Sequence, residues 1–309
     1  MTGRFAPSPT GDLHVGNLRT ALLAWLLARA AGRSFLVRME DLDRVTSSPA
    51  HEARQLADLH RLGLDWDGEV VRQSERFARY EAAIEVLAGR GATYECFCSR
   101  REIREAVAAP HGPGPELAYP GTCRELTSAE RARRRRERPP ALRLLAEGAR
   151  LDVDDALAGS FRGTVDDVVL RRNDGVPAYN LAVVVDDAAQ GVTEVVRGAD
   201  LLSSTPRQVL LQRLLGLDPV TRYAHVPLVV GDDGQRLAKR HGAVTLDDLA
   251  VAGVDPADVL GALARSLGMA FGGPVASAGE LLAPFAEAGL AALPERSVEL
   301  AELRRSWGR

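Results

Sequence analysis

Apolar and polar positions follow strand and helix patterns in turn over the first part of the chain. Residues 2–6 are typical of a short strand and are followed by a turn rich in Pro, Gly and Ser. Leucines and a tryptophan then recur at helical spacing over residues 18–26, which predicts an amphipathic helix ending near Gly32. A buried strand is expected at 34–39 and a helix at about 49–62. This order predicts a parallel sheet with crossover helices.

The rest of the chain interrupts this pattern, resumes it and then becomes helical. Residues 94–124 contain all three cysteines and a loop rich in Pro and Gly. We expect a helix at 127–138, short strands within 141–171, a hydrophobic strand at 179–185, a helix at 204–216, a strand at 225–230 and helices from 243 onward. The chain therefore divides into four expected regions, at residues 1–93, 94–165, 166–242 and 243–309.

Composition narrows the possible classes of function. The chain has 39 Lys and Arg against 42 Asp and Glu, a net charge of −3. An RNA partner would therefore have to meet a local basic face, and the arginine-rich run at 131–138 is more typical of a solvated helix. No apolar run is long enough to span a membrane, and the N-terminus lacks a secretory signal layout. Three clustered cysteines argue against a disulfide framework. We expect a cytoplasmic protein with no membrane partner.

The segment from Arg4 to Asn17 joins the first strand to the first helix and predicts an anion site. Backbone N–H groups at a helix start, with the positive end of the helix dipole, favour phosphate. Gly11 and Gly16 would permit a tight turn and the close approach of a flat base. His14 can donate a hydrogen bond or carry positive charge toward a triphosphate. Such turns also occur in ordinary loops, so the prediction depends on a second element.

The second element is the basic stretch at 236–240, which follows the strand at 225–230. A cationic loop in this position could close on the pyrophosphate that leaves ATP. Lys239 is the only lysine of the chain, and arginine replaces lysine readily on a surface but not where a compact ammonium is required. Lys239 is therefore a catalytic candidate together with His14, although most basic turns are simply solvated.

These two segments resemble the signature motifs of the glutamyl- and glutaminyl-tRNA synthetases. The opening RFAPSPTGDLHVGN is similar to theirs, with HVGN at 14–17 in the place of His-Ile-Gly-His. RLAKR at 236–240 is similar to their Lys-Met-Ser-Lys-Ser loop, with Lys239 at the second lysine. Both motifs depart from the family pattern, because Asn17 replaces a histidine and Ala238 lacks the serine hydroxyl.

The resemblance implies a class I synthetase fold: a Rossmann-like parallel-sheet catalytic domain in two halves, a small zinc-containing insertion and a helical C-terminal part. It also implies an ATP site that uses Mg²⁺ with the nucleotide. The implied ATP-binding residues are Gly11, His14, Gly16, Asn17, Arg236 and Lys239. Glutamate has two carboxylates and an ammonium, which call for guanidinium groups and an acidic partner. The implied glutamate-binding residues are Arg4, Ala6, Ser8, Glu40, Tyr179 and Arg197.

A narrower resemblance concerns the acceptor of the glutamate. The stretch at 179–202 and the Cys-x-Cys…Tyr-x3-Cys pattern are similar to the glutamyl-queuosine tRNA(Asp) synthetases, the truncated relatives of glutamyl-tRNA synthetase. About 70 residues follow Lys239, too few for a large anticodon-binding region. The resemblance implies tRNA-independent formation of glutamyl-adenylate and transfer of glutamate to queuosine in the anticodon stem-loop of tRNA(Asp). Two alternatives remain: a truncated glutamyl-tRNA synthetase that charges the 3′ end of tRNA(Glu), and a non-catalytic paralogue that binds RNA or an amino acid.

The three cysteines predict a structural zinc site. Cys96 and Cys98 are two positions apart, and Cys123 lies 25 positions beyond. Structural zinc takes four ligands, so one position remains open. The resemblance implies Tyr119 as the fourth ligand, while His111 is the chemically more ordinary alternative. Reduced cysteines without a metal are also possible, because Cys-x-Cys is less diagnostic than paired Cys-x2-Cys. Zinc here would stabilise the insertion and has no evident catalytic role.

Overall fold

A parallel sheet lies at the centre of the computed structural model, which describes residues 2–99, 101–103, 119–237, 241, 244–272 and 274–307. The strand order is β3-β2-β1-β9-β10-β6-β7. Neighbouring strands run parallel except for β6 and β7, which pair antiparallel. Its strands are β1 Thr2–Phe5, β2 Ser34–Met39, β3 Val71–Arg72, β6 Arg150–Asp155, β7 Gly159–Thr164, β9 Glu194–Gly198 and β10 Arg222–Val226.

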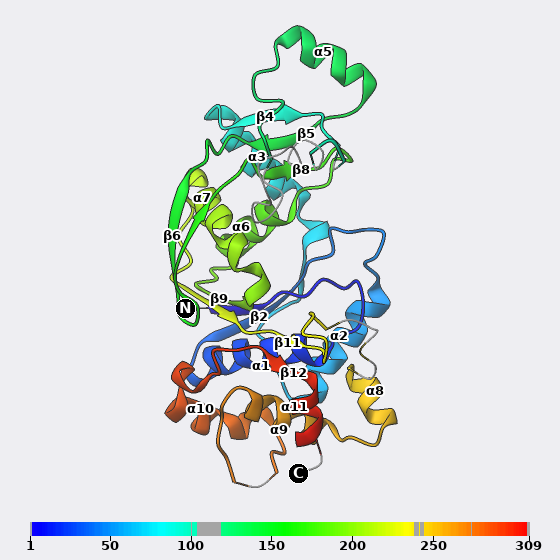
Figure 1. Ribbon diagram of the computed structural model, residues 1–309, viewed down its shortest axis with the longest axis vertical. Coiled ribbons are helices and arrows are strands. Elements are labelled where there is room, and N and C mark those ends of the chain that lie inside the picture. Colours follow the sequence, from blue (N-terminus) through cyan, green and yellow to red (C-terminus); the bar gives the residue numbers. More distant parts are fainter. Residues whose placement is uncertain are drawn as a thin grey trace.

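Helices cover both faces of this sheet (Figure 1). α1 contacts β1, β2 and β9 on one face, and α3, α6 and α7 pack together on the other. The chain leaves β1 toward one edge and β9 toward the opposite edge, so right-handed crossovers place α1 and α7 on opposite faces. The helices of this region are α1 Val15–Ala30, α2 Pro49–Arg61, α3 Phe77–Gly89, α6 Tyr179–Ala189 and α7 Thr205–Leu215.

The C-terminal helices form a further layer below α1 in Figure 1. α9 and α10 contact α1, and the two-residue strands β11 and β12 pair parallel beside it. α1 is therefore buried on more than one side, and Leu18, Leu22 and Leu26 are fully buried. The helix was predicted in the right place, but it is not the one-sided amphipathic helix that we expected. The elements are β11 Val229–Val230, α8 Leu246–Val251, α9 Pro256–Ser266, α10 Leu282–Ala288, β12 Val298–Glu299 and α11 Leu300–Ser306.

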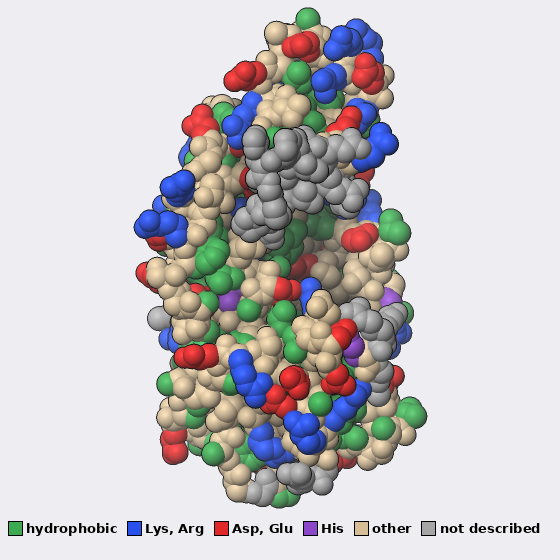
Figure 2. Space-filling view, viewed as in Figure 1, with side chains coloured by type: hydrophobic (Ala, Val, Ile, Leu, Met, Phe, Trp, Pro, Cys, Tyr) green, Lys and Arg blue, Asp and Glu red, His purple; other side chains and the backbone are tan. Residues whose placement is uncertain are grey.

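A second, antiparallel sheet with strand order β4-β5-β8 lies toward the opposite end of the long axis. Its strands are β4 Thr93–Cys96, β5 Ala141–Leu144 and β8 Val169–Arg171. The outermost element is α5, Ser128–Glu137, which begins at a capping box made by Thr127 and Glu130 and buries no residue. Basic and acidic side chains are mixed over this end of the molecule (Figure 2). β6 and β7, within the expected region 94–165, pair with the central sheet instead.

Two expected strands differ in the structure. Residues 179–185 belong to α6, not to a strand. A short run of valines fits a buried strand or a buried helix equally well, and burial on most sides between α3, α7 and the sheet favours the helix. The expected strand at 225–230 is divided at Pro227, which has no N–H to donate: β10 ends at Val226 and β11 belongs to a separate pair.

Within the described ranges, every helix is too short or too polar to cross a membrane.

Candidate active site

A cavity of about 580 Å³ opens at the carboxyl ends of β1 and β9. These neighbouring strands send their crossovers in opposite directions, and this is where open α/β sheets bind ligands. The cavity brings together every predicted ATP- and glutamate-binding residue that lies in the described part of the chain. They are Arg4, Ala6, Ser8, Gly11, His14, Gly16, Asn17, Glu40, Tyr179, Arg197 and Arg236. Lys239, with Ala238 and Arg240, lies outside the described residues.

The start of α1 offers fewer free backbone donors than the sequence predicts. Val15 N–H donates to Val244 O at 2.8 Å, and Asn17 N–H donates to His14 Nδ1 at 3.2 Å. Asn17 Oδ1 accepts the His14 N–H at 3.2 Å, which completes a capping box. Of the first three helical N–H groups, only that of Gly16 has no partner in the described part of the chain. The free donors here are thus this N–H and the His14 side chain.

His14 is a neutral hydrogen-bond donor in this setting. Because Nδ1 accepts a backbone N–H, the ring proton belongs on Nε2. Burial, and next the positive charge of Arg236, lower the pKa of His14 to about 4. Of the two roles that the sequence leaves open, donation of a hydrogen bond therefore fits the structure without bound nucleotide, and positive charge does not.

Gly11 and Gly16 provide space in the cavity. Neither has a positive φ, so the tight turn that we expected is not the reason for glycine at these positions. A Cβ at Gly16 would lie 3.1 Å from the His14 ring, whereas a Cβ at Gly11 would enter open space. Gln55 of α2 fixes the turn that contains Gly11, because its Nε2 donates to Ser8 O at 3.0 Å and Gly11 O at 2.7 Å.

Arg236 brings the beginning of the basic loop to the cavity. Its Nη1 lies 2.9 Å from Asp200 Oδ2, although the Arg236 side chain is 64% exposed. Leu237, the next residue, is buried. Arg236 thus lies on the side of the cavity that also carries His14.

Arg4 forms one wall of the deeper part of the cavity and is held from behind by a carboxylate. Its Nε and Nη2 lie 3.4 and 3.5 Å from the two oxygens of Asp187, and its Nη1 donates to Val196 O at 3.2 Å. Arg38, also buried, donates to the same Asp187 at 2.7 Å. Burial alone would raise the pKa of Asp187, but Arg4 and Arg38 hold it below its usual value. Asp187 is therefore ionised and anchors Arg4.

Glu40 lies beside Arg4 at the end of β2. Its backbone N–H donates to Pro7 O at 2.9 Å, and its Oε1 lies 3.5 Å from Arg38 Nη2. Burial raises the pKa of Glu40, although Arg38 and Arg4 oppose this shift. The carboxyl can thus accept a cationic group, whose charge would favour its ionised form. Ala6 and Ser8 border the same space and contribute backbone and small side chains.

Arg197 forms the opposite wall, at the end of β9, and is 5% exposed. Its Nη1 lies 3.4 Å from the Tyr179 hydroxyl, and its Nη2 donates to Thr205 Oγ1 at 2.8 Å. Its Nε donates to His225 Nε2 at 3.0 Å, and His225 Nδ1 lies 2.6 Å from Asp155 Oδ2. Two arginines therefore face one cavity, each held by a different kind of partner.

The sequence did not identify the residues that hold these arginines. Asp187 and the adjacent Asp186 end an apolar run, and acidic residues are seldom buried without partners. Two acidic residues directly after an apolar run therefore indicated a buried ion pair. His225, Asp155 and Arg38 gave no comparable signal, because each is paired with a residue far away in sequence.

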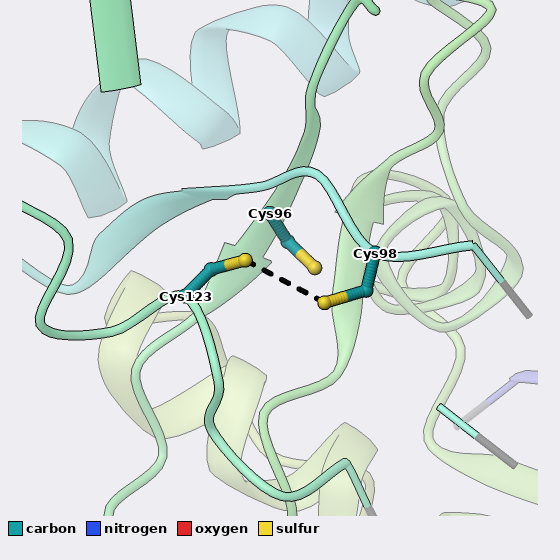
Figure 3. Close-up of side chains that lie close together, drawn as sticks. All are labelled: Cys96, Cys98 and Cys123. Carbon is teal, nitrogen blue, oxygen red and sulfur yellow. Dashed lines mark hydrogen bonds between the residues drawn. The ribbon is translucent and has the colours of Figure 1, made fainter. Parts of the chain in front are cut away.

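The three cysteines converge at the end of β4, whose last residue is Cys96 (Figure 3). Their sulfur atoms lie within 4.8 Å of one another, and Cys98 Sγ is 3.6 Å from Cys123 Sγ. The Tyr119 hydroxyl lies 3.7 Å from Cys98 Sγ and accepts the Cys123 N–H at 2.9 Å. A hydrogen bond with Cys96 lowers the pKa of Cys123 to about 6. The cluster can hold a metal ion; His111 lies outside the described residues.

Comparison with known proteins agrees with this geometry. The family model for the catalytic domain of class I tRNA synthetases (E and Q) matches residues 1–278. The glutamyl-Q tRNA(Asp) synthetase of Nocardia farcinica is 64% identical over 284 residues, covering 92% of this chain and 88% of that protein. The protein of the same name from Cutibacterium acnes is 55% identical over 269 residues, covering 86% of this chain and 76% of that protein.

The solved structures agree as well. A glutamate-tRNA synthetase from Elizabethkingia anophelis superposes with a TM-score of 0.82 at 26% identity, covering 99% of this chain and 69% of that one. A glutamate tRNA ligase from Elizabethkingia meningosepticum, solved in complex with its amino acid, has the same TM-score and identity, over 99% and 68% of the two chains. The predicted class I synthetase fold is confirmed. The chain therefore belongs to the class I tRNA synthetases (E and Q) and, within them, to the glutamyl-Q tRNA(Asp) synthetases.

Proposed function

We propose that this protein activates L-glutamate with ATP, without tRNA for that step, and transfers the glutamyl group to queuosine at the wobble position of tRNA(Asp). The observation that carries the proposal is a single cavity in which the start of α1 lies beside two buried arginines and a glutamate whose side chain is 9% exposed. The relatives that are 64% and 55% identical carry the name of this activity and support the choice of acceptor.

In the first step, an α-carboxylate oxygen of glutamate attacks the α-phosphorus of ATP. A bond between them forms, and the bond from that phosphorus to the oxygen of pyrophosphate breaks. Class I synthetases use ATP with Mg²⁺, which neutralises phosphate charge. The chain contributes positioning and electrostatic stabilisation: the N–H groups of Gly16 and His14 Nε2 as donors, and Arg236 and Lys239 as cations near the leaving group. In the second step, a queuosine hydroxyl attacks the acyl carbon and AMP leaves.

Recognition of glutamate requires two sites for carboxylates and one for an ammonium. Arg4 and Arg197 fit the carboxylates, because Arg4 keeps two N–H groups, and Arg197 keeps one, without a partner among the described residues. Glu40 fits the ammonium, and the added positive charge would lower its raised pKa. Tyr179 and the 6–8 segment close the remaining sides of this amino-acid site.

The cysteine cluster suits zinc. Two thiolates on one tetrahedral zinc, each at about 2.3 Å, lie about 3.8 Å apart, and Cys98 Sγ and Cys123 Sγ are 3.6 Å apart. We propose Cys96, Cys98, Cys123 and Tyr119 as the ligands of one structural Zn²⁺. They lie in an insertion at 94–165, between catalytic halves at 1–93 and 166–242, and the last strands of this insertion, β6 and β7, join the central sheet. A helical region at 243–309 completes the proposed organisation, and a tRNA acceptor suits a cytoplasmic enzyme.

The acceptor is tested with labelled glutamate, ATP, Mg²⁺ and three RNAs: tRNA(Asp) with queuosine, tRNA(Asp) without it, and tRNA(Glu). We expect label only on the first, with nuclease digestion placing the ester in the anticodon loop. Labelling of tRNA(Asp) that ignores queuosine would contradict the proposal. Label at the 3′ end of tRNA(Glu) would indicate a truncated glutamyl-tRNA synthetase.

Glutamate-dependent exchange of pyrophosphate into ATP tests the first step separately. We expect exchange in the absence of any tRNA. Its absence at saturating glutamate would indicate a non-catalytic paralogue, and aspartate in place of glutamate serves as the matched substrate control.

A further inference from the structure

His225 lies behind Arg197 and is 1% exposed. Its Nε2 is close to two donors: Arg197 Nε at 3.0 Å and Thr205 Oγ1 at 3.1 Å. Thr205 Oγ1 already accepts an N–H from Arg197 at 2.8 Å, so its own proton is available for His225. Two donors converge on one nitrogen, and that nitrogen must therefore be unprotonated.

The other ring nitrogen identifies the tautomer. His225 Nδ1 lies 2.6 Å from Asp155 Oδ2, which accepts the Nδ1 proton. Asp155 Oδ1 accepts the backbone N–H groups of His225, Leu157 and Ala158, at 3.2, 2.9 and 2.8 Å. These bonds fix the orientation of the carboxylate at the end of β6. Asp155 thus selects a neutral, Nδ1-protonated imidazole.

We propose that His225 and Asp155 are positioning residues for glutamate: together they orient Arg197 through a neutral acceptor on its Nε–H. This inference rests on the proposed function of the cavity. Arg4 is held directly by the carboxylate of Asp187, which offsets its charge. Arg197 is held by an uncharged ring, with the supporting carboxylate one residue further away. Arg197 therefore keeps its charge for a substrate carboxylate while its plane is fixed.

Asp155→Asn tests the tautomer with almost no change of shape. The amide oxygen can keep the three backbone N–H bonds, which directs the NH₂ group at His225 Nδ1. The ring proton must then move to Nε2, where it opposes the Arg197 N–H. We expect the KM for glutamate in ATP–pyrophosphate exchange to rise about ten- to a hundredfold, the scale of one hydrogen bond to a charged group. The KM for ATP and kcat should stay within about twofold.

Two substitutions at His225 form the matched pair. In His225→Gln the amide oxygen can accept the Arg197 Nε–H, so we expect the KM for glutamate within about fivefold of wild type. His225→Leu removes the acceptor and should raise that KM as Asp155→Asn does. This pair decides the question even if the Asp155 variant does not fold. ¹⁵N NMR of the ring should show Nδ1 protonated in wild type and Nε2 protonated in Asp155→Asn.

Three outcomes would overturn the inference. They are an unchanged KM for glutamate in Asp155→Asn, equal effects of Gln and Leu at position 225, and a fall in kcat and a rise in the KM for ATP that match the rise in the KM for glutamate. Lack of exchange by wild type would count against the proposed function instead. Calorimetric titration of the same variants with glutamate would then decide the role of His225 by itself.

Discussion

His14 titrates differently in the folded and the unfolded chain. Burial and the charge of Arg236 lower its pKa from 6.5 to about 4. Above pH 6.5 the imidazole is neutral in both states and adds nothing to pH dependence. Between pH 6.5 and 4 the unfolded chain binds a proton that the folded chain does not bind. The free energy of unfolding therefore falls as the pH falls through this window, by up to about 3 kcal/mol.

His14→Asn should remove most of this dependence. Asparagine is a good N-cap and can still accept the Asn17 N–H, so α1 should be retained. We expect the loss of unfolding free energy between pH 7 and pH 5 to be about 2 kcal/mol smaller in the variant than in wild type. Denaturant unfolding at both pH values measures this difference. Equal losses in the two proteins would show that another group titrates.

At the scale of elements, the sequence predicted best where periodicity was strong. β1, α1, β2 and α2 occur where expected, because each has its own apolar pattern and turn residues. The strand expected at 179–185 is α6, since the surroundings of a short apolar run, not its composition, decide between helix and strand. In the cavity, too, local sequence patterns were predictable and long-range contacts were not. Its motif residues were predictable, but Arg4 and Asp187 are 183 positions apart, and only the folded chain brings them together.

The cysteine cluster joins the end of β4 to the segment before α5, and we expect the zinc proposed there to stabilise this region. Purified protein should contain about one zinc per chain by elemental analysis, as a four-ligand site predicts. Tyr119→Phe should weaken zinc binding at least tenfold in competition with a chelator, because it removes an oxygen ligand. His111→Ala, the matched control, should bind zinc like wild type. If His111→Ala loses zinc and Tyr119→Phe does not, the fourth ligand is His111 and not Tyr119.

Removal of this zinc should affect the insertion more than the chemistry. The cysteines contact Tyr94, Phe97 and Tyr119 in a hydrophobic cluster of their own, and none of them lines the cavity. ATP–pyrophosphate exchange by Cys98→Ser should therefore stay near wild type, while transfer to tRNA(Asp) falls if this region contacts the acceptor.

At the scale of the whole molecule, Arg19 connects the central sheet to the C-terminal helices. It is 1% exposed in α1, and its guanidinium donates to Pro227 O at 2.7 Å and to Ser266 O at 3.0 Å. No carboxylate pairs with it in the part of the chain that the structure describes. Burial lowers its pKa to about 10, so it stays charged at neutral pH. Among the described residues, the charge of Arg19 is compensated only by neutral acceptors, and it keeps those in α9 only while α9 stays in contact with α1.

Arg19→Met keeps much of the side-chain volume but leaves the carbonyls of Pro227 and Ser266 without donors. We expect the free energy of unfolding to fall by about 2–4 kcal/mol, since buried acceptors lose their partners. Val244 O, in the segment before the C-terminal helices, accepts the first N–H of α1. Loosening of the contact between α1 and the C-terminal helices should therefore disturb the start of α1 and raise the KM for ATP. Arg79→Met, at an exposed arginine of α3, is the matched control and should change stability by less than about 0.5 kcal/mol. If Arg19→Met is as stable as this control, the C-terminal helices are held by apolar packing alone, and the arginine is not what couples them to the site.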